Sequence, residues 1–398
     1  MAKPKLALIP STVGGSVYSV LPSNGDGDFD FSRASAATRI NAQGLIETVA
    51  ATDNRLNYPL LDGTVQTCPH LLLEGQRTNL ITQSESFDNA AWVKNNLTVT
   101  SNAAISPDGT LNADLLNFTL SGNYIDYAGT ITIGQSYTVS CYVKSAVSSN
   151  QTFNIYGNAN KVAAFAATSE WQRFTHTFTA DITAMSSGIN STALNQLYVW
   201  GFQLEEGSYS TSYIVSNSGS ATTRIAEVCD GSGNASTFND SEGVLMVQAG
   251  FVDDTSFKGI SISSGVNANS IRMYSSLVDN QLVFRVRVND VDQVLKLITL
   301  SNTSISNKIS IKYKENDFSI FVNGFKLETA TSGITYPAET LNQLNFNRSD
   351  GNDPFYGKTK QIGYYNTILT DLELETLTSY RSWESMVNEL NLNIIYNG

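Results

Sequence analysis

Aromatic and hydrogen-bonding side chains share one face of three predicted strands in the middle of the chain. In residues 137–144, 153–158 and 170–179, apolar residues alternate at period two with a face that carries one aromatic residue beside Lys, Asn or Arg. A sugar needs this combination, because a ring stacks on the pyranose while amides and guanidinium groups bind its hydroxyls. If the strands are neighbours, we expect a glycan-binding surface made of Tyr142, Lys144, Asn154, Tyr156, Trp171 and Arg173. The alternative is ordinary sheet-surface aromatics or a subunit interface.

A second face with cationic side chains lies later in the chain. Residues 282–288, LVFRVRV, alternate apolar residues with Arg285 and Arg287. These two arginines are the secondary candidates for glycan binding.

The sequence carries little that would support catalysis. The two histidines are His70 and His176. We expect His176 to lie in the core, because it falls on the same face of its strand as the neighbouring phenylalanines. The GxSxG, HExxH, P-loop and GxGxxG motifs do not occur. The acid pairs 205–206 and 253–254 are adjacent residues, which point to opposite faces of a strand and so form no glycosidase dyad alone. We therefore expect a protein that is not an enzyme and has no catalytic residues.

Composition limits the class of partner. The net charge of −12 argues against nucleic acid, whose phosphates need clustered Lys and Arg. Charged residues make up only 15%, which suits many short strands joined by turns. No apolar run reaches the roughly 20 residues needed to cross a membrane, so we expect no membrane insertion. Cys68, Cys141 and Cys229 are predicted to be buried free thiols rather than disulfide partners.

Strand periodicity predicts an all-β fold of two antiparallel sandwiches in tandem. Residues 197–206 alternate apolar side chains on both faces, with Tyr198, Trp200 and Phe202 expected on one of them. Asn323-Gly324 is a type I′ hairpin signal in the last sandwich, and residues 370–373 form a helix capping box. The predicted segments are an N-terminal arm (1–78), a jelly roll (79–215), a linker (216–240), a second sandwich (241–370) and a C-terminal helix and tail (371–398).

Four segments carry a resemblance to virion proteins of tailed bacteriophages, such as tail or head fibres, spikes and decoration proteins. They are FSRASAATRINAQGLIE (31–47), LLLEGQRTNLI (71–81), WGFQLEEGSYSTSYI (200–214) and PFYGKTKQIGYYNTILTDLEL (354–374). The resemblance implies that the middle domain is a jelly roll like carbohydrate-binding modules, and that the last domain is laminin-G-like or concanavalin A-like. It also implies that the N-terminal arm docks to other virion proteins. Such modules hold a structural calcium near their first and last strands. The matching positions in this chain are Glu85 and Gln203, but Gln203 stands where an acid is usual.

These observations together indicate a lectin-like protein on the virion surface, made in the host cytoplasm, that binds host-surface glycans during adsorption. A purely structural decoration or connector protein is the alternative, and a glycan depolymerase is the third reading. No cofactor is expected apart from that calcium.

The apolar C-terminal segment generates a prediction about assembly. We expect a homotrimer, because fibre-like virion proteins sit on symmetric particles and homo-oligomers favour closed symmetry. The interface candidates are Trp383, Met386, Val387, Leu390 and Ile394. Deleting the residues after Arg381 should weaken the assembly, as measured by mass in solution. A clean monomer of the full chain at micromolar concentration would contradict the prediction.

Overall fold

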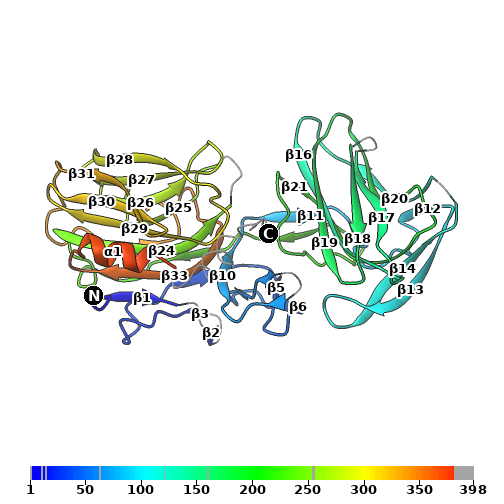
Figure 1. The fold of residues 1–398 in the computed structure, drawn as a ribbon, viewed down its shortest axis with the longest axis horizontal. Coiled ribbons are helices and arrows are strands. Elements are labelled where there is room, and N and C mark those ends of the chain that lie inside the picture. Colours follow the sequence, from blue (N-terminus) through cyan, green and yellow to red (C-terminus); the bar gives the residue numbers. More distant parts are fainter. Residues whose placement is uncertain are drawn as a thin grey trace, which may run out of the picture.

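The computed structural model describes residues 2–9, 12–13, 16–61, 64–120, 122–158, 161–252 and 256–380. It is almost entirely β, and the described residues hold one helix, α1 (Asp371–Thr378). Two sandwiches form the two lobes of the molecule, with the hairpin of β5 (Ala37–Ile40) and β6 (Ile46–Val49) between them (Figure 1). The predicted all-β fold of antiparallel sandwiches is confirmed. Within the described residues no helix is long and apolar enough to cross a membrane.

The middle sandwich consists of two five-stranded antiparallel sheets. In order, the first is β12 (Trp92–Asn95), β15 (Asn123–Thr130), β20 (Ala184–Ser191), β17 (Gln151–Gly157) and β18 (Lys161–Ala167). The second is β13 (Leu97–Ile105), β14 (Leu111–Phe118), β21 (Gln196–Glu206), β16 (Ser136–Ser145) and β19 (Gln172–Thr179). Trp92 and Phe202 meet edge to face in the core between the sheets, with ring centroids 5.2 Å apart.

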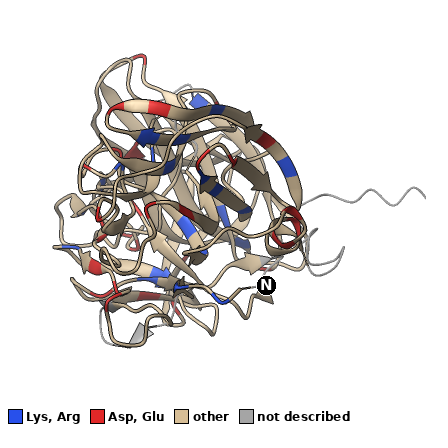
Figure 2. Cartoon of the chain, turned by 90° about the vertical axis from the view of Figure 1, so that its left-hand side faces the viewer, with Lys and Arg blue, Asp and Glu red and all other residues tan. Residues whose placement is uncertain are grey.

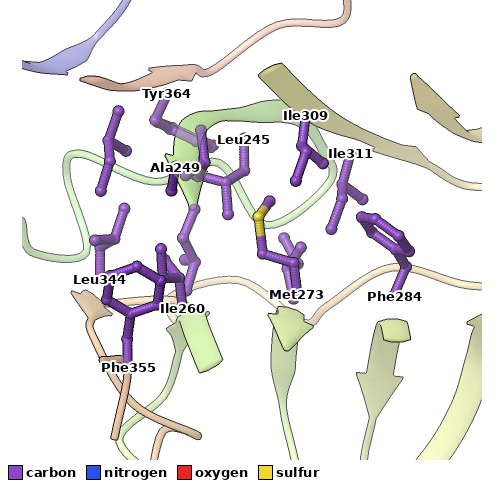
Figure 3. Packing of buried hydrophobic residues seen from close by; sticks show 14 of the residues in the cluster. Leu245, Ala249, Ile260, Met273, Phe284, Ile309, Ile311, Leu344, Phe355 and Tyr364 are labelled. Atoms are coloured by element: carbon purple, nitrogen blue, oxygen red, sulfur yellow. The ribbon is translucent and has the colours of Figure 1, made fainter. Parts of the chain in front are cut away.

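The last sandwich pairs a larger sheet with a five-stranded one. The larger sheet has the order β31 (Phe325–Ala330), β30 (Phe318–Val322), β29 (Asn307–Lys314), β24 (Glu242–Phe251), β33 (Gly357–Tyr365), β10 (His70–Leu73), β7 (Leu56–Asn57), and β1 (Leu6–Leu8) also pairs with β33. The smaller sheet has the order β28 (Val291–Thr299), β27 (Gln281–Val288), β26 (Ser270–Ser275), β25 (Gly259–Ser263), β32 (Gln343–Asn345). Leu245 and Ile309 from one sheet face Met273 and Phe284 from the other across the core (Figure 3).

The N-terminal segment differs from the predicted arm. Strands β1, β7 and β10 belong to the larger sheet of the last sandwich, so residues far apart in sequence share one core. Leu6 and Leu71 are fully buried there. The physical reason is that the short apolar runs of this segment pair their backbone groups with β33 and with one another.

The predicted linker 216–240 is also a paired segment. Its strands β22 (Thr222–Arg224) and β23 (Val228–Asp230) pair with β11 (Arg77–Asn79) and β4 (Asp30–Ser32). Arg224 and Glu227 within it are buried. The Ser- and Gly-rich composition of this segment did not reveal these strand pairs, because their partners lie far away in sequence.

A buried network of arginines and glutamates joins these segments where the two sandwiches meet. Glu227 accepts hydrogen bonds from Arg33 Nη1 (2.7 Å) and Arg55 Nε (2.8 Å), and both ion pairs are fully buried. Glu74 is paired with Arg55 and Arg224, each at 2.8 Å. Burial alone would raise the pKa of Glu74, but Arg224 and Arg55 hold it well below its usual range. We call these five residues the junction network.

A bulge at Gly201 changes the predicted faces of β21. Gly201 has a φ of +65°, and the pairing of β16 with β21 shifts register at this point. Tyr198 and Trp200 therefore point away from the sandwich core, whereas Phe202 points into it. The expectation that all three share one face is wrong, because a bulge reverses the alternation.

Several local predictions have definite outcomes. Asn323 and Gly324 both have positive φ in the β30–β31 hairpin, and Thr370 forms the capping box of α1 with Glu373, so both signals are confirmed. Cys141 and Cys229 are buried free thiols, but Cys68 is exposed because the turn before β10 leaves it in solvent. The five interface candidates from Trp383 to Ile394 lie outside the described residues, and the trimer stays a prediction.

The junction network predicts a large cost for removing one charge. Replacing Glu227→Gln leaves Arg33 without its buried carboxylate and Arg55 with Glu74 alone, so we expect a loss of about 3–5 kcal/mol in the free energy of unfolding. The matched control is Glu47→Gln, which removes the half-exposed partner of Arg39 and should cost at most about 1 kcal/mol. Denaturant unfolding of the full chain measures both. Equal losses in the two variants would contradict a structural role for the network.

The lowered pKa of Glu74 also predicts a pH dependence. A carboxyl whose pKa is depressed in the folded state stabilises the fold above its unfolded pKa of about 4.3, and this contribution is lost as the pH falls towards the folded value. The Glu74→Gln variant should therefore be less stable at neutral pH, and its stability should fall less between about pH 5 and pH 3. Parallel stability curves for the variant and the parent chain would refute this assignment.

Candidate functional site

Four of the six predicted binding residues lie on one outer face of the middle sandwich. Strands β19, β16 and β21 are neighbours, and Tyr142 stands opposite Arg173 on one side and Trp200 on the other. Lys144 stands opposite Tyr198. Because paired residues project to the same side of a sheet, Tyr142, Lys144, Trp171, Arg173 and Tyr198 share this face. We call these five residues the aromatic–cationic face.

Cations and rings on this face are in direct contact. The Lys144 ammonium lies over the rings of Trp171 (5.1 Å) and Tyr198 (5.4 Å), measured to the ring centroids. The Arg173 guanidinium lies 5.5 Å from the Tyr142 centroid. Such contacts hold a positive charge beside an aromatic surface, and neither Lys144 nor Arg173 forms an ion pair with any residue that the structure describes. The Trp171, Tyr198 and Lys144 side chains are all half-buried, so one part of each remains accessible.

The surrounding backbone fixes the orientation of two of these side chains. Trp171 Nε1 donates to the carbonyl of Ile105 (3.0 Å), and Arg173 donates to the carbonyl of Thr211 (2.6 Å) and to Ser140 Oγ (2.9 Å). Burial raises the pKa of Tyr142, with Arg173 acting in the opposite direction, so the phenol remains a neutral hydrogen-bonding group. The face is therefore pre-organised for a neutral or anionic ligand.

A cleft of about 180 Å³ opens beside Tyr142 and Arg173, between the sandwich and the β5–β6 hairpin. Ile46 of that hairpin packs on Trp200 and Tyr213 and so forms part of the boundary. Three basic side chains line the cleft, namely Arg39, Arg173 and Lys358. The lining acid is Glu74, whose charge is already balanced by the junction network.

The two remaining predicted residues lie elsewhere. Asn154 and Tyr156 are on β17, which belongs to the other sheet of the sandwich. Asn154 Nδ2 donates to Asn190 (2.7 Å), and Tyr156 is 5% exposed with its hydroxyl donating to the carbonyl of Ile125 (3.0 Å). The expectation that all six residues share one surface is wrong, because the chain crosses between sheets after β16. Tyr198, which completes the face, was missed because the bulge at Gly201 obscured its direction.

A larger hollow of about 560 Å³ lies near the other end of β16. Two of its polar side chains interact within the protein: Tyr137 accepts a hydrogen bond from Thr132 N (3.0 Å), and Arg77 stacks on Tyr209 and lies 3.7 Å from Glu205. We favour the smaller cleft as the functional one because its basic groups outnumber its acids and adjoin the aromatic–cationic face.

The other predicted groups have the following environments. Glu85 accepts from the Tyr213 hydroxyl (2.7 Å), and burial raises its pKa. Gln203 is buried between Glu205 and the backbone of Ile214. Within the described ranges no group of three His, Cys, Asp or Glu side chains is placed to hold a metal ion. His176 is half-buried, with its ring centroid 5.9 Å from that of Phe178, and burial lowers its pKa.

Comparisons with known proteins give structural likenesses only. No protein-family model matches the chain, and no curated protein matches it either. Among solved structures, it is similar to the Ruminococcus gnavus IT-sialidase CBM40 (15% identity, 38% of this chain, 94% of that one, TM-score 0.32). It is also similar to the C-terminal CBM6 of LamC from Zobellia galactanivorans (14% identity, 33% of this chain, 98% of that one, TM-score 0.24). A third similar structure is a Limulus polyphemus SAP-like pentraxin (11% identity, 36% of this chain, 71% of that one, TM-score 0.28). At these scores the likenesses carry no argument about function.

Proposed function

We propose that the protein is a non-catalytic, lectin-like component of a bacteriophage particle that binds host-surface glycans through the aromatic–cationic face and its adjoining cleft. The observation that carries the proposal is the Lys144 ammonium held between the rings of Trp171 and Tyr198, next to the Arg173–Tyr142 pair. The virion setting rests on the sequence resemblance of the four segments described above.

A sugar ring can take the place of Lys144 on either aromatic ring at small cost. An exposed cation–π contact is worth about 0.5–1 kcal/mol, and the lysine stem is flexible. The displaced ammonium stays close enough to donate to a sugar hydroxyl. The aromatic–cationic face can therefore stack a sugar ring and place charged donors at the edge of that ring.

The charge of the cleft favours a glycan that carries a carboxylate. Arg39, Arg173 and Lys358 line it, and although Arg39 is paired with Glu47 (2.6 Å), Arg173 and Lys358 form no ion pair with a described residue. Charge-assisted bonds from guanidinium groups to carboxylates are about twice as strong as neutral ones. A single site of this kind is expected to be weak, near millimolar, which corresponds to only about 4 kcal/mol. Display of many copies on one particle raises the effective affinity.

A second candidate function is assembly, and one surface favours it. Strands β28 and β31 are the edges of the two sheets of the last sandwich and carry the exposed side chains Leu297 (56%) and Phe325 (69%). Lys296 and Glu328 connect these edges at 2.9 Å. Exposed apolar strand edges are typical of surfaces covered by another subunit. This observation supports a decoration or connector role, with or without glycan binding.

The glycan proposal predicts that Trp171 is essential for binding. Replacing Trp171→Ala removes a stacking surface and a contact of Lys144, so retention on a glycan array should fall at least tenfold. Loss of its hydrogen bond to Ile105 should lower the melting temperature by only a few degrees, since one hydrogen bond contributes a net stability of about 1 kcal/mol.

The matched control is Tyr124→Ala, which removes an exposed tyrosine from the other sheet of the same sandwich. Its retention should equal that of the parent chain, whereas Tyr198→Ala should behave like Trp171→Ala. Full retention by folded Trp171→Ala and Tyr198→Ala variants would place any glycan site elsewhere and end this proposal.

A further inference from the structure

The smaller sheet of the last sandwich carries two rows of polar side chains on its outer face. In one row Ser261, Arg272 and Arg285 stand opposite one another on β25, β26 and β27. In the other, Ser270 stands opposite Arg287. The residues that alternate with them, including Ile271 and Phe284, point into the core. The two rows therefore form one contiguous polar surface on adjacent strands.

Several buried donors on this surface have no acceptor in the described part of the chain. They are the side-chain groups Ser261 Oγ, Ser270 Oγ, Arg272 Nε and Arg287 Nε. Arg272 is 2% exposed, and its guanidinium stacks on the Tyr274 ring at 5.2 Å from the centroid. Buried polar groups are normally paired, so four such atoms on neighbouring residues are an exceptional arrangement.

The arginines around Arg272 contrast with it, because each has an acid. Arg285 binds Asp292 through two hydrogen bonds (2.6 and 2.7 Å). Arg348 pairs with both Asp350 (3.0 Å) and Asp353 (3.1 Å). Arg272 forms no ion pair with any described residue. Burial lowers its pKa to about 10, and Arg285, Arg348 and Arg287 act in the same direction.

We propose that Arg272, Ser261 and Ser270 form a binding site for an oxyanion group, such as a carboxylate, a sulfate or a phosphate. Two hydroxyls and a guanidinium supply the donors that such a group accepts from, and the charge that binds the anion is that of Arg272, because the neighbouring arginines are paired with aspartates. This site is separate from the aromatic–cationic face and does not depend on the function proposed for it.

Entry to the site is controlled by the surrounding arginines. The side chains of Arg285, Arg287 and Arg348 are 21%, 19% and 34% exposed, and their ion pairs lie at the surface. Surface ion pairs of ordinary geometry contribute only about 0–1 kcal/mol, so the Arg287 side chain, whose ion pairs are 3.3 and 3.8 Å long, swings outward at little cost. Acidic and basic residues are interspersed over this end of the molecule (Figure 2), which favours one discrete site over a diffuse positive surface.

The test measures anion binding by the full-length chain. Sulfate is titrated by calorimetry and thermal melting at constant ionic strength set with sodium chloride, which separates a specific site from general salt effects. We expect saturable binding and a rise in melting temperature for the parent chain. Arg272→Met should weaken sulfate binding at least tenfold. Without sulfate it should melt at the same temperature or higher, because it removes a buried charge that lacks an acceptor.

The control is Lys314→Met, which removes one positive charge from the other sheet of the same sandwich, where Lys314 pairs with Glu242. It should bind sulfate like the parent chain. Parallel titrations with phosphate, glucuronate and neutral glucose identify the preferred group, and glucose should not bind. Equal responses of Arg272→Met and the parent chain, or no saturable binding of any of the three anions, would overturn the proposal.

Discussion

The buried ion pairs of Glu227 reinforce the short pairing of β4 with β23 and extend it to Arg55, so they hold together segments that lie far apart in sequence. Arg33 and Arg55 come from the N-terminal segment, and Glu227 comes from the stretch between the sandwiches. Taking such charges out of water is costly, and the cost is offset only when every partner is in place. The fold therefore requires the N-terminal segment in its observed position, because otherwise the arginines and glutamates would be buried without their partners.

The junction network also positions part of the candidate site. Ser212 donates to Glu74 from its backbone (2.8 Å) and its hydroxyl (2.6 Å), and so fixes the loop that follows β21. The neighbouring Thr211 carbonyl accepts from Arg173. The junction network thus orients Arg173 on Tyr142 through two residues of one loop, Thr211 and Ser212, and both of them line the cleft. Damage to the network is expected to reach the binding face through this loop.

Much of the fold could be predicted from local sequence patterns. The arrangement of the site could not, because it depends on contacts between residues far apart in sequence. Period-two alternation, the Asn323-Gly324 turn and the Thr370 cap are local signals, and they gave the correct elements. Tyr156 was misplaced because neighbouring strands in sequence lie in different sheets. The direction of Tyr198 depended on one bulge. Glu227 was missed because nothing in a stretch rich in Ser and Gly reveals that its carboxylate meets arginines almost two hundred positions away.

The overall charge of the chain shapes how both proposed sites work. A net charge of −12 repels an acidic ligand at a distance, but salt screens charges beyond about 8 Å at physiological ionic strength. Arg39, Arg173 and Lys358 at one site and Arg272 with its neighbours at the other therefore act only on groups that have nearly reached contact. Recognition then depends on the geometry of each cluster rather than on long-range attraction, and an acidic protein can bind an acidic ligand without attracting polyanions in general.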